Sequence, residues 1–479
     1  MTVAQPNPLF YWYYPFDSGA TDLSGMYNFH SYILERAGTL MDDQEANKYY
    51  PSRDFYYTAQ AWGYWDNAMQ NWRRWRQPSG EALRGSIFMA LAYGCKGVYI
   101  EPLLSYLSDE TCPSCTTMGL TKYPLPATNE LNPLGEYVRG SLSPRITEKL
   151  GPKLAKVQLT DMGANRLVLY KNLGTAWLRP GVPTPIDVTV ANNNELTITD
   201  LEQSIDPVFF LGTLLSRQQG NIYYDNYYKV ICLANLITDV NFDPSKRVRI
   251  KISNRTGTNN AVLRNIESGA DIVFGNEYSF EEVFERGDGR FYELSSVLHI
   301  GGPLTNSDTI NSPMNLIEKD LVVKAGSKLV INTMYEAEKN IIVEGGGEVV
   351  VNAAGTLKFS KGARFQAGGR LKINGGTIDF TGDSIGVITG IICSPGSEII
   401  TTGGNISNAQ YGIASTGSGN IKLNGTSFNN CGTGISITDF GGEFPEIINC
   451  NLSVGTLGIS LIGGIKALVS DNTITTIGG

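Results

Sequence analysis

Apolar residues recur about every two dozen positions near the C-terminus, and this period predicts a repeat architecture. Ile406, Phe428, Leu452 and Ile474 lie 22, 24 and 22 residues apart. Two further sets of apolar residues recur with the same period. Six residues after each of the first three come Gly412-Ile413, Gly434-Ile435 and Gly458-Ile459. Five residues before each of the last three come Leu423, Ile447 and Val469. Three short apolar runs per repeat, separated by Gly, Asn, Ser and Thr, indicate the coils of a right-handed parallel β-helix.

Shorter strand-turn units lead into these repeats. They begin at Leu321–Val323 and continue to Leu371–Ile373, and the run Gly345–Asn352 recurs in outline at Gly368–Asn374. We therefore predict a β-helix over residues 315–479. The next glycine of the repeat falls one position beyond Gly479, so we expect the sequence to be a piece of a longer protein whose last coil is incomplete.

The middle of the chain alternates apolar and polar residues with a period of two, the pattern of half-buried strands. The runs are Leu167–Tyr170, Ile186–Val190, Val230–Leu233, Val248–Ile252, Ile272–Phe274 and Phe291–Leu294. Turn sequences such as Asn192–Asn194 and Arg286–Gly289 separate them, and these predict an antiparallel β-sandwich over residues 161–305. The Arg-Gly-Asp tripeptide at 286–288 is interpreted as turn chemistry rather than as an integrin motif.

Strands and helices alternate in the N-terminal part. The expected order is an aromatic strand at 8–16, a helical period from Tyr27 to Met41, a strand at Phe55–Trp62, a helix and a strand at Gly97–Ile100. The second helix has Ser79 as N-cap, and Gly94 ends it. Such alternation predicts a parallel sheet with crossover helices. The fold class is therefore multidomain, α/β followed by all-β.

A run of residues in this part carries a family resemblance. The segments Trp75–Arg84, Phe88–Gly94 and Lys96–Ile100 resemble the last helix and strand of a TIM-barrel glycoside hydrolase of the β-galactosidase-like kind. The resemblance covers about residues 8–160, with Leu134–Lys156 as the closing helix. It implies that residues 1–160 are the C-terminal part of the barrel, with only the last three strands present. Residues 286–294 are similar to the closing hairpin of the β-domains that follow such barrels.

The resemblance places chemistry at the C-terminal ends of the strands, where barrel active sites lie. Retaining glycosidases use one carboxylate as acid/base and a second as nucleophile. In the family the acid/base is on strand four, upstream of this sequence, and the nucleophile ends strand seven. Here strand seven ends in Gln60-Ala-Trp62, without a carboxylate. Glu101 and Asp17 are the catalytic candidates, although Glu101 also suits a surface position and Asp17 also suits a turn.

Aromatic residues at the same strand ends are candidates for binding a sugar. Trp62 and Trp65 follow the presumed strand seven, and a flat ring with a polar edge suits a pyranose. Trp12 and Gln60 complete the predicted substrate contacts. The alternative role of the tryptophans is packing in the core.

The composition of the chain limits the classes of binding partner that we expect. The formal net charge is −8, charged residues make up 18% of the chain, and no arginine follows Arg370. This excludes the basic stripe of a nucleic-acid-binding protein. The sequence contains no stretch of 18 or more apolar residues, so no membrane-spanning helix is predicted. Cys112 and Cys115 are spaced like a metal or redox pair, but with two histidines in the chain we predict a loop disulfide or free thiols, and neither a metal site nor a cofactor.

These patterns favour part of a secreted or cell-surface bacterial protein that contacts a polysaccharide or other glycan. One hypothesis is a carbohydrate-active enzyme that hydrolyses a glycosidic bond in the full-length molecule, with this piece inactive by itself. The alternative is a non-catalytic adhesin or surface structural protein with a glycan-binding β-helix. A β-helix polysaccharide lyase is disfavoured, because residues after 375 offer only Lys422 and Lys466 as basic groups and scattered acidic ones.

Overall fold

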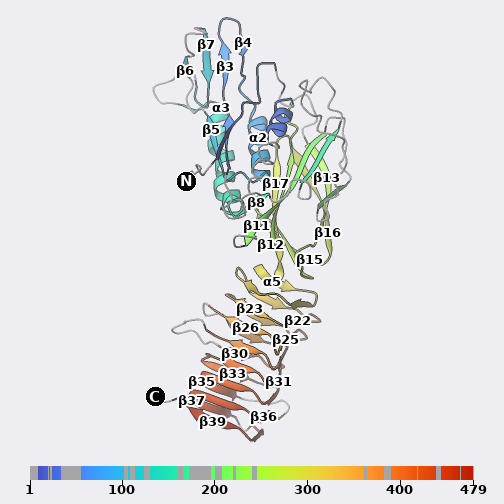
Figure 1. Cartoon of the computed structure of the whole chain (residues 1–479), viewed down its shortest axis with the longest axis vertical. Helices are drawn as coiled ribbons and strands as arrows, with labels where there is room; N and C mark the ends of the chain where they lie inside the picture. The colour runs from blue at the N-terminus through green and yellow to red at the C-terminus, as the bar shows by residue number, and fades with distance from the viewer. Residues whose placement is uncertain are drawn as a thin grey trace, which may run out of the picture. The chain divides into compact units, whose positions relative to one another are not determined.

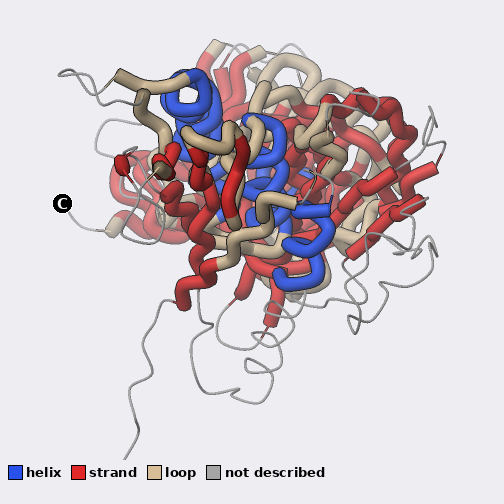
Figure 2. Tube along the Cα trace, turned by 90° about the horizontal axis from the view of Figure 1, so that it is seen from above, coloured by secondary structure: helices blue, strands red, loops and turns tan. Residues whose placement is uncertain are grey.

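Two compact units make up the chain in the computed structural model (Figure 1). They comprise Met1–Arg255 with Leu263–Ile272 and Glu277–Leu294, and Thr256–Val262 with Val273–Asn276 and Ser295–Gly479. The structure describes residues 9–19, 21, 24–33, 55–101, 106–107, 114–122, 130–159, 166–171, 196–199, 208–219, 223–239, 245–360, 364–381, 390–417, 419–438, 444–463 and 465–477. Strands predominate over helices (Figure 2). Among the described helices, none combines the length and apolarity needed to cross a membrane.

A three-stranded parallel sheet opens the first unit. Its strands β1 (Leu9–Trp12), β2 (Phe55–Gln60) and β5 (Gly97–Glu101) lie side by side in chain order. A helix at 24–33 and α2 (Gly80–Ala92) occur between successive strands. The predicted strand–helix alternation and parallel sheet are therefore confirmed. The described residues show three parallel strands here, and their membership of a larger barrel stays a prediction.

Helix α2 has the predicted ends. The Ser79 side chain accepts a hydrogen bond from the backbone N–H of Ala82 at 3.0 Å, and Glu81 lies in the first turn. Gly94 leaves the helix with a φ of 88°, a conformation that glycine adopts without strain. The helix is buried over most of its length, from Ala82 to Ala92 apart from Arg84. It therefore fills the centre of this unit.

The predicted closing helix is present but irregular. It consists of α3 (Pro133–Tyr137), two π-helical segments η1 (Val138–Leu142) and η2 (Arg145–Leu150), and α4 (Gly151–Leu154). Pro144 precedes η2 and lacks the N–H that an α-helical bond at this point needs. Lys96 donates hydrogen bonds to the carbonyls of Leu154 and Ala155, at 3.2 and 3.3 Å, and to that of Val157. Its positive charge thus stabilises the C-terminal end of the helix.

A four-stranded antiparallel sheet was not predicted from the sequence. Its order is β4 (Asn71–Arg73), β3 (Gly63–Asp66), β7 (Cys115–Met118) and β6 (Tyr106–Leu107). Strands β3 and β4 follow the carboxyl end of β2, whereas β6 and β7 follow that of β5. Pairing of β3 with β7 joins the two loops. The sheet therefore begins at the carboxyl edge of the parallel sheet, at the top of Figure 1.

Two antiparallel sheets follow in the chain. One is seven-stranded, with β8 (Val157–Leu159), β9 (Arg166–Lys171), β11 (Val208–Gln219), β12 (Tyr223–Asn235), β14 (Ala261–Asn265), β15 (Asp271–Phe274) and β17 (Gly289–Ser296). The other is three-stranded, with β10 (Leu196–Thr199), β13 (Ser245–Ser253) and β16 (Glu277–Glu285). The rings of Phe210 on β11 and Phe284 on β16 meet at 5.0 Å, so the two sheets face each other. The predicted strands are confirmed except Ile186–Val190, which lies outside the described residues.

Arg145 ties the closing helix to the antiparallel sheets. Its guanidinium pairs with Glu267 and Asp288, both at 2.7 Å, and donates to the carbonyl of Gly289 at 2.6 Å. It also lies 4.6 Å from the centre of the Phe88 ring on α2. Burial acts to raise the pKa of Asp288, but the neighbouring arginines, Arg145 first, hold it below its ordinary value. One side chain thus links three elements of the first unit.

The Arg-Gly-Asp tripeptide is a packed turn, as predicted. Gly287 has a φ of 60°, and a Cβ at this position would lie 2.2 Å from the Glu81 carbonyl oxygen. Arg84 donates to the carbonyls of Gly287, at 3.1 Å, and Arg286. Asp288 is buried. These contacts fix the turn on α2.

The second unit is a parallel β-solenoid of about seven turns between residues 302 and 476, which confirms the predicted parallel β-helix. The strand β18 begins at Gly302, earlier than the predicted start at 315. Two columns of stacked strands contain β18 (Gly302–Leu304), β21 (Leu321–Val323), β24 (Ile341–Val343), β27 (Phe365–Ala367), β30 (Gly390–Cys393) and β33 (Tyr411–Thr416), and then β19 (Asp308–Ile310), β22 (Lys328–Ile331), β25 (Glu348–Asn352), β28 (Arg370–Asn374), β31 (Glu398–Thr402), β34 (Asn420–Asn424), β36 (Glu446–Ile448) and β38 (Leu468–Ser470).

A third column contains β20 (Met314–Leu316), β23 (Met334–Ala337), β26 (Thr356–Phe359), β29 (Thr377–Asp379), β32 (Asn405–Ser407) and β39 (Thr473–Thr476). The long strands β35 (Ser427–Thr438) and β37 (Asn451–Ile462) run from the third column into the first. A short helix, α5 (Val297–Ile300), precedes the first coil, and its apolar side chains belong to the solenoid core.

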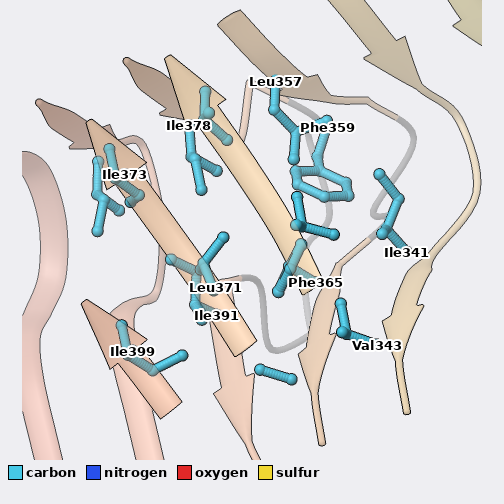
Figure 3. Packing of buried hydrophobic residues seen from close by; sticks show 14 of the residues in the cluster. Ile341, Val343, Leu357, Phe359, Phe365, Leu371, Ile373, Ile378, Ile391 and Ile399 are labelled. Carbon is cyan, nitrogen blue, oxygen red and sulfur yellow. The ribbon is translucent and has the colours of Figure 1, made fainter. Parts of the chain in front are cut away.

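The repeat residues of the sequence stack in register. Phe428 pairs with Ile406 before it and Leu452 after it, and Leu452 pairs with Ile474. The other two columns stack in the same way, through Ile413, Ile435 and Ile459 and through Leu423, Ile447 and Val469. Figure 3 shows the equivalent packing in earlier coils, where side chains such as Leu357, Ile373 and Ile378 point into one apolar interior. The period is therefore the length of one coil.

Turns between the second and third columns share one backbone conformation. Gly375, Gly403 and Gly425 have φ values of 77°, 71° and 68°, and Asn449 and Asp471 follow in the next coils with 54° and 55°. This left-handed conformation is open to Gly and, among the other residues, mostly to Asn and Asp.

Asparagine side chains also stack from coil to coil beside the second column. The Nδ2 of Asn352 donates to Asn332 at 2.8 Å, and that of Asn332 donates to Asn311 at 2.9 Å. The Gly, Asn and Asp residues of these turns thus have a structural reason in the coils named here.

Replacing Arg145 with Met is expected to destabilise the first unit by about 2–4 kcal/mol at pH 7, because Glu267 loses its arginine and the buried Asp288 keeps only Arg290 as a paired cation. A carboxyl whose pKa is lowered by folding stabilises the fold above about pH 4 and loses that contribution as the pH falls. The loss caused by the substitution should therefore shrink between pH 7 and pH 3. Urea unfolding followed by tryptophan fluorescence at both pH values measures it.

Arg249 provides the matched control. It pairs with Glu281 at 2.8 Å, but both side chains are about half exposed, at 50% and 51%. Arg249→Met should change the stability by less than about 1 kcal/mol. Equal losses for the two variants would contradict the role given to Arg145.

Candidate functional site

The carboxyl edge of the parallel sheet is the candidate site. Strands β1, β2 and β5 end at Trp12, Gln60 and Glu101, and β2 pairs with β5 so that Gln60 lies beside Glu101. Ligands of parallel α/β sheets bind at this edge, in the loops that follow the strands. Of the sequence-predicted site residues, Trp12, Gln60 and Glu101 end strands, and Trp62 lies between β2 and β3. Trp65 is within β3, and Asp17 is outside the named strands.

Gln60 is fully used by the protein itself. Its Oε1 accepts from the backbone N–H of Phe16 at 3.2 Å. Its Nε2 lies at hydrogen-bond distance from the carbonyls of Phe16, Trp62 and Arg76, at 3.2, 3.0 and 3.0 Å. The side chain is completely buried. Gln60 therefore fastens three loop segments together, and the N–H groups of its buried amide are taken up by backbone carbonyls.

Glu101 lies at the open side of this edge. Its backbone carbonyl accepts from Ala61 N at 3.0 Å, which fixes the end of β5. The side chain is exposed, and its Oε2 accepts from the hydroxyl of Tyr14 at 3.3 Å. Burial, and then the charge of Glu101, raise the pKa of Tyr14, so the hydroxyl stays protonated and donates. The carboxylate is thus oriented and open to solvent.

Asp17 has a local partner. Its Oδ1 accepts from the backbone N–H of Gly19 at 3.1 Å. A backbone bridge joins Asp17 to Trp75. These contacts are those of an Asp that begins a turn before Ser-Gly. A catalytic role for Asp17 stays a prediction.

Four aromatic side chains gather next to Glu101, and we call Tyr14, Trp62, Tyr64 and Trp75 the aromatic cluster. Ring centres of Trp62 lie 5.2 Å from Tyr14 and 5.0 Å from Tyr64, and Tyr14 lies 5.8 Å from Trp75, all edge to face. Trp62 is 8% exposed and occupies the middle of the cluster, whereas the other three are partly exposed. Packing therefore takes up most of Trp62, and the outer members present the accessible ring surface.

The remaining predicted aromatic residues lie elsewhere. Trp65 on β3 is opposite Trp72 on β4, with ring centres 5.2 Å apart, and both side chains are partly exposed. Because side chains alternate along a strand, this pair is on the opposite face of the sheet from Tyr64. The side chain of Trp12 lies outside the described residues.

Asp66 holds the β3–β4 hairpin in shape. Its carboxylate accepts from the backbone N–H groups of Ala68 and Met69, at 2.9 and 3.1 Å, and from Ser114 at 2.9 Å. Arg73 pairs with it at 2.8 Å and, with these bonds, lowers its pKa to about 2. The hairpin that carries Tyr64 and Trp65 is thus rigidly placed.

The described cysteines are either disulfide-bonded or buried thiols. Cys115 on β7 is disulfide-bonded. The other described cysteines, Cys95, Cys232, Cys393, Cys431 and Cys450, are free and buried. Cys112, the partner expected for a loop disulfide, lies outside the described residues. Within the described ranges no three His, Cys, Asp or Glu side chains form a group that could hold a metal ion.

Three members of the aromatic cluster were not singled out from the sequence as site residues. Tyr14 ends the aromatic run of the first strand, Tyr64 follows Trp62 by two positions, and Trp75 begins the segment that carries the family resemblance. Because side chains alternate along a strand, the spacing of two residues from Trp62 could have indicated that Tyr64 lies on the same side. Nothing local indicated that Tyr14 and Trp75 lie together.

No protein-family model, curated protein or solved structure matches the chain. The glycoside hydrolase resemblance therefore rests on the segment Trp75–Ile100 and on the order of strands and helices.

Gln60→Glu is expected to lower the stability of the first unit by about 2–4 kcal/mol at pH 7.5, because a buried carboxylate would face three carbonyl oxygens. Burial would raise the pKa of this carboxyl above its unfolded value of about 4.3. The variant should then be nearly as stable as the wild type below that pH and lose stability as the pH rises. Urea midpoints at pH 4.5 and 7.5, followed by tryptophan fluorescence, measure the difference.

Gln70→Glu is the matched control, since Gln70 is exposed. It should be nearly neutral at both pH values. A loss that is equal at pH 4.5 and 7.5 for Gln60→Glu would rule out the buried carboxylate as its cause.

Proposed function

We propose that this chain is the non-catalytic, carbohydrate-binding part of a secreted or cell-surface protein, and that its first unit is related to the end of a glycoside hydrolase barrel. The observation that carries the proposal is the aromatic cluster beside Glu101 at the carboxyl edge of the parallel sheet. The β-solenoid serves as a stiff, extended surface. The disulfide of Cys115 supports the location, because disulfides persist in oxidising compartments.

The chemistry of the cluster suits a sugar. Pyranose rings have apolar C–H faces and a rim of hydroxyl groups, so they bind well to aromatic rings with polar groups alongside. Tyr64 and Trp75 supply partly exposed rings, and Glu101 supplies an oriented acceptor. The Trp65–Trp72 pair provides a second aromatic platform on the other face of the same hairpin.

The strand ends argue against hydrolysis by this chain. A retaining mechanism needs two carboxyl groups about 5–5.5 Å apart. The residue in register with Glu101 is Gln60, a neutral amide whose N–H groups are taken up by backbone carbonyls. A hydrolytic full-length protein is the second candidate, favoured by the family-like segment Trp75–Arg84, and its acid/base would be on a strand outside this sequence.

The solenoid surface does not favour a polysaccharide lyase. Basic side chains of the second column are paired with acidic ones in neighbouring coils: Glu348 lies between Lys328 and Lys372, and Arg370 pairs with Glu398. Lyases need a free base and a cationic site that neutralises a uronate. These pairs leave the described face close to neutral.

Trp75→Ala and Tyr64→Ala are each expected to weaken binding of a neutral polysaccharide about 10-fold or more, since each removes an outer ring of the cluster. Affinity electrophoresis in gels containing galactan, mannan or β-glucan, followed by calorimetry with the matching oligosaccharide, measures the effect. Tyr99 on β5 is the control, because it is an aromatic residue, 53% exposed, outside the cluster. Undiminished binding by both cluster variants would overturn the proposed site.

The isolated chain is expected to release no aryl group from nitrophenyl β-galactoside, β-glucoside or β-mannoside above the buffer rate. Glu101→Gln should leave that result unchanged. Turnover by the wild-type chain that Glu101→Gln abolishes would show that the chain is an enzyme.

A further inference from the structure

Two buried polar atoms near the aromatic cluster have no hydrogen-bond partner among the described residues. They are Nε1 of Trp62 and Oγ1 of Thr117 on β7. The two side chains are 8% and 1% exposed. Leaving such a group unpaired costs about 1–3 kcal/mol, and native proteins satisfy nearly all of them, with a water or a ligand where no protein group is at hand.

Both residues are neighbours of Tyr64, which lies on one face of the antiparallel sheet. Thr117 is directly opposite Tyr64 in the pairing of β7 with β3, and directly paired residues project to one side. The Tyr64 ring contacts the Trp62 ring at 5.0 Å, and Trp62 in turn contacts Tyr14. A continuous row thus runs from Glu101 through Tyr14, Trp62 and Tyr64 to Thr117.

The neighbouring threonine shows that the geometry of β7 does not by itself leave hydroxyls unpaired. Thr116 is also fully buried, but it projects to the opposite face, and its Oγ1 accepts from Asn67 Nδ2 at 2.9 Å. Asn67 is itself held by the carbonyl of Ser114 at 2.8 Å. Of these two buried threonines, the one without a described partner is therefore the one on the face that carries Tyr64.

We propose that the indole N–H of Trp62 and the hydroxyl of Thr117 are specificity-determining groups that bind hydroxyls of a neutral sugar. This inference rests on the proposed carbohydrate site and deepens it. The indole N–H can only donate, so it selects an oxygen acceptor, whereas the threonine hydroxyl both donates and accepts. The ligand class is a neutral hexose unit with free hydroxyl groups. A site built around a ligand hydroxyl discriminates against an analogue that lacks it, because the buried groups are then left unpaired.

The decisive variant is Thr117→Val, which keeps the shape of the side chain and removes the hydroxyl. If the hydroxyl has no partner in the free protein, the variant should be as stable as the wild type or slightly more stable. Its affinity for the neutral oligosaccharide should fall about 3- to 10-fold, the effect of one hydrogen bond. Trp62→Phe keeps an aromatic ring and removes the N–H, and should weaken binding by a similar factor.

The probes are cellotetraose, mannotetraose and β-1,4-galactotetraose, titrated in turn by calorimetry, and then monodeoxy methyl glycosides of the sugar that binds. One deoxy position should weaken binding to the wild type and have no further effect on Thr117→Val. Thr116→Val is the matched control: it should lower stability, because it removes the Asn67 contact, and leave affinity unchanged.

The outcomes separate the two proposals. Wild-type binding that Thr117→Val and Trp62→Phe leave unaltered would overturn this inference and keep the proposed function. A loss of stability in Thr117→Val without loss of affinity would assign the hydroxyl to an internal water and overturn it as well. Failure of the wild type to bind any neutral glycan would overturn the proposed function together with the inference.

Discussion

The requirement that every buried backbone N–H and carbonyl be paired shapes both units of this protein. In the solenoid each strand meets it by bonding to the equivalent strands of the coils before and after it. The same stacking brings Phe428 onto Ile406 and Leu452, so hydrogen bonding and apolar burial depend on one register. A coil has neither without its neighbours. At the first coil α5 covers the core, whereas Val469 and Ile474, in the last described coil, are 45% and 51% exposed.

The same requirement decides the character of the candidate site. Where β2 ends, the chain leaves the parallel sheet, and nearby backbone groups lose their regular partners. The side chain of Gln60 replaces them by bonding to Phe16, Trp62 and Arg76. Because a neutral amide both donates and accepts, it can satisfy this environment, whereas a carboxylate cannot donate. The position where the family resemblance implies a nucleophile therefore has a structural task that excludes a charge.

The loops at the carboxyl edge of the parallel sheet are held by side-chain and strand contacts. Asp66 orders the β3–β4 hairpin through four contacts, and pairing of β3 with β7 joins it to the segment after β5. Within the aromatic cluster, Tyr64 lies on β3 and Trp75 is bridged to Asp17, whereas Tyr14 and Trp62 lie in the segments that connect the strands. The proposed sugar site would therefore need little ordering when its ligand binds.

The sequence by itself determined the features that depend on local periodicity. These include the coil length of the solenoid, the ends of α2 at Ser79 and Gly94, the parallel strands β1, β2 and β5, and most strands of the antiparallel sheets. The spacing of apolar residues recurs along each of these segments, so it can be recognised without knowing which other segments pack against them. The four-stranded sheet could not be predicted in this way, because strands of two to four residues are too short to show a period.

Only the tertiary structure decided the roles of the site residues. In the sequence, Gln60, Trp62 and Glu101 all occupy similar positions at or near the ends of strands. In the structure, Gln60 is hydrogen-bonded to backbone groups, Trp62 is buried, and Glu101 is exposed. Thr117 gave no signal at all, since its importance comes from the absence of a described partner in a buried place. Such properties follow from what distant segments bring near a side chain, and no spacing along the chain specifies that.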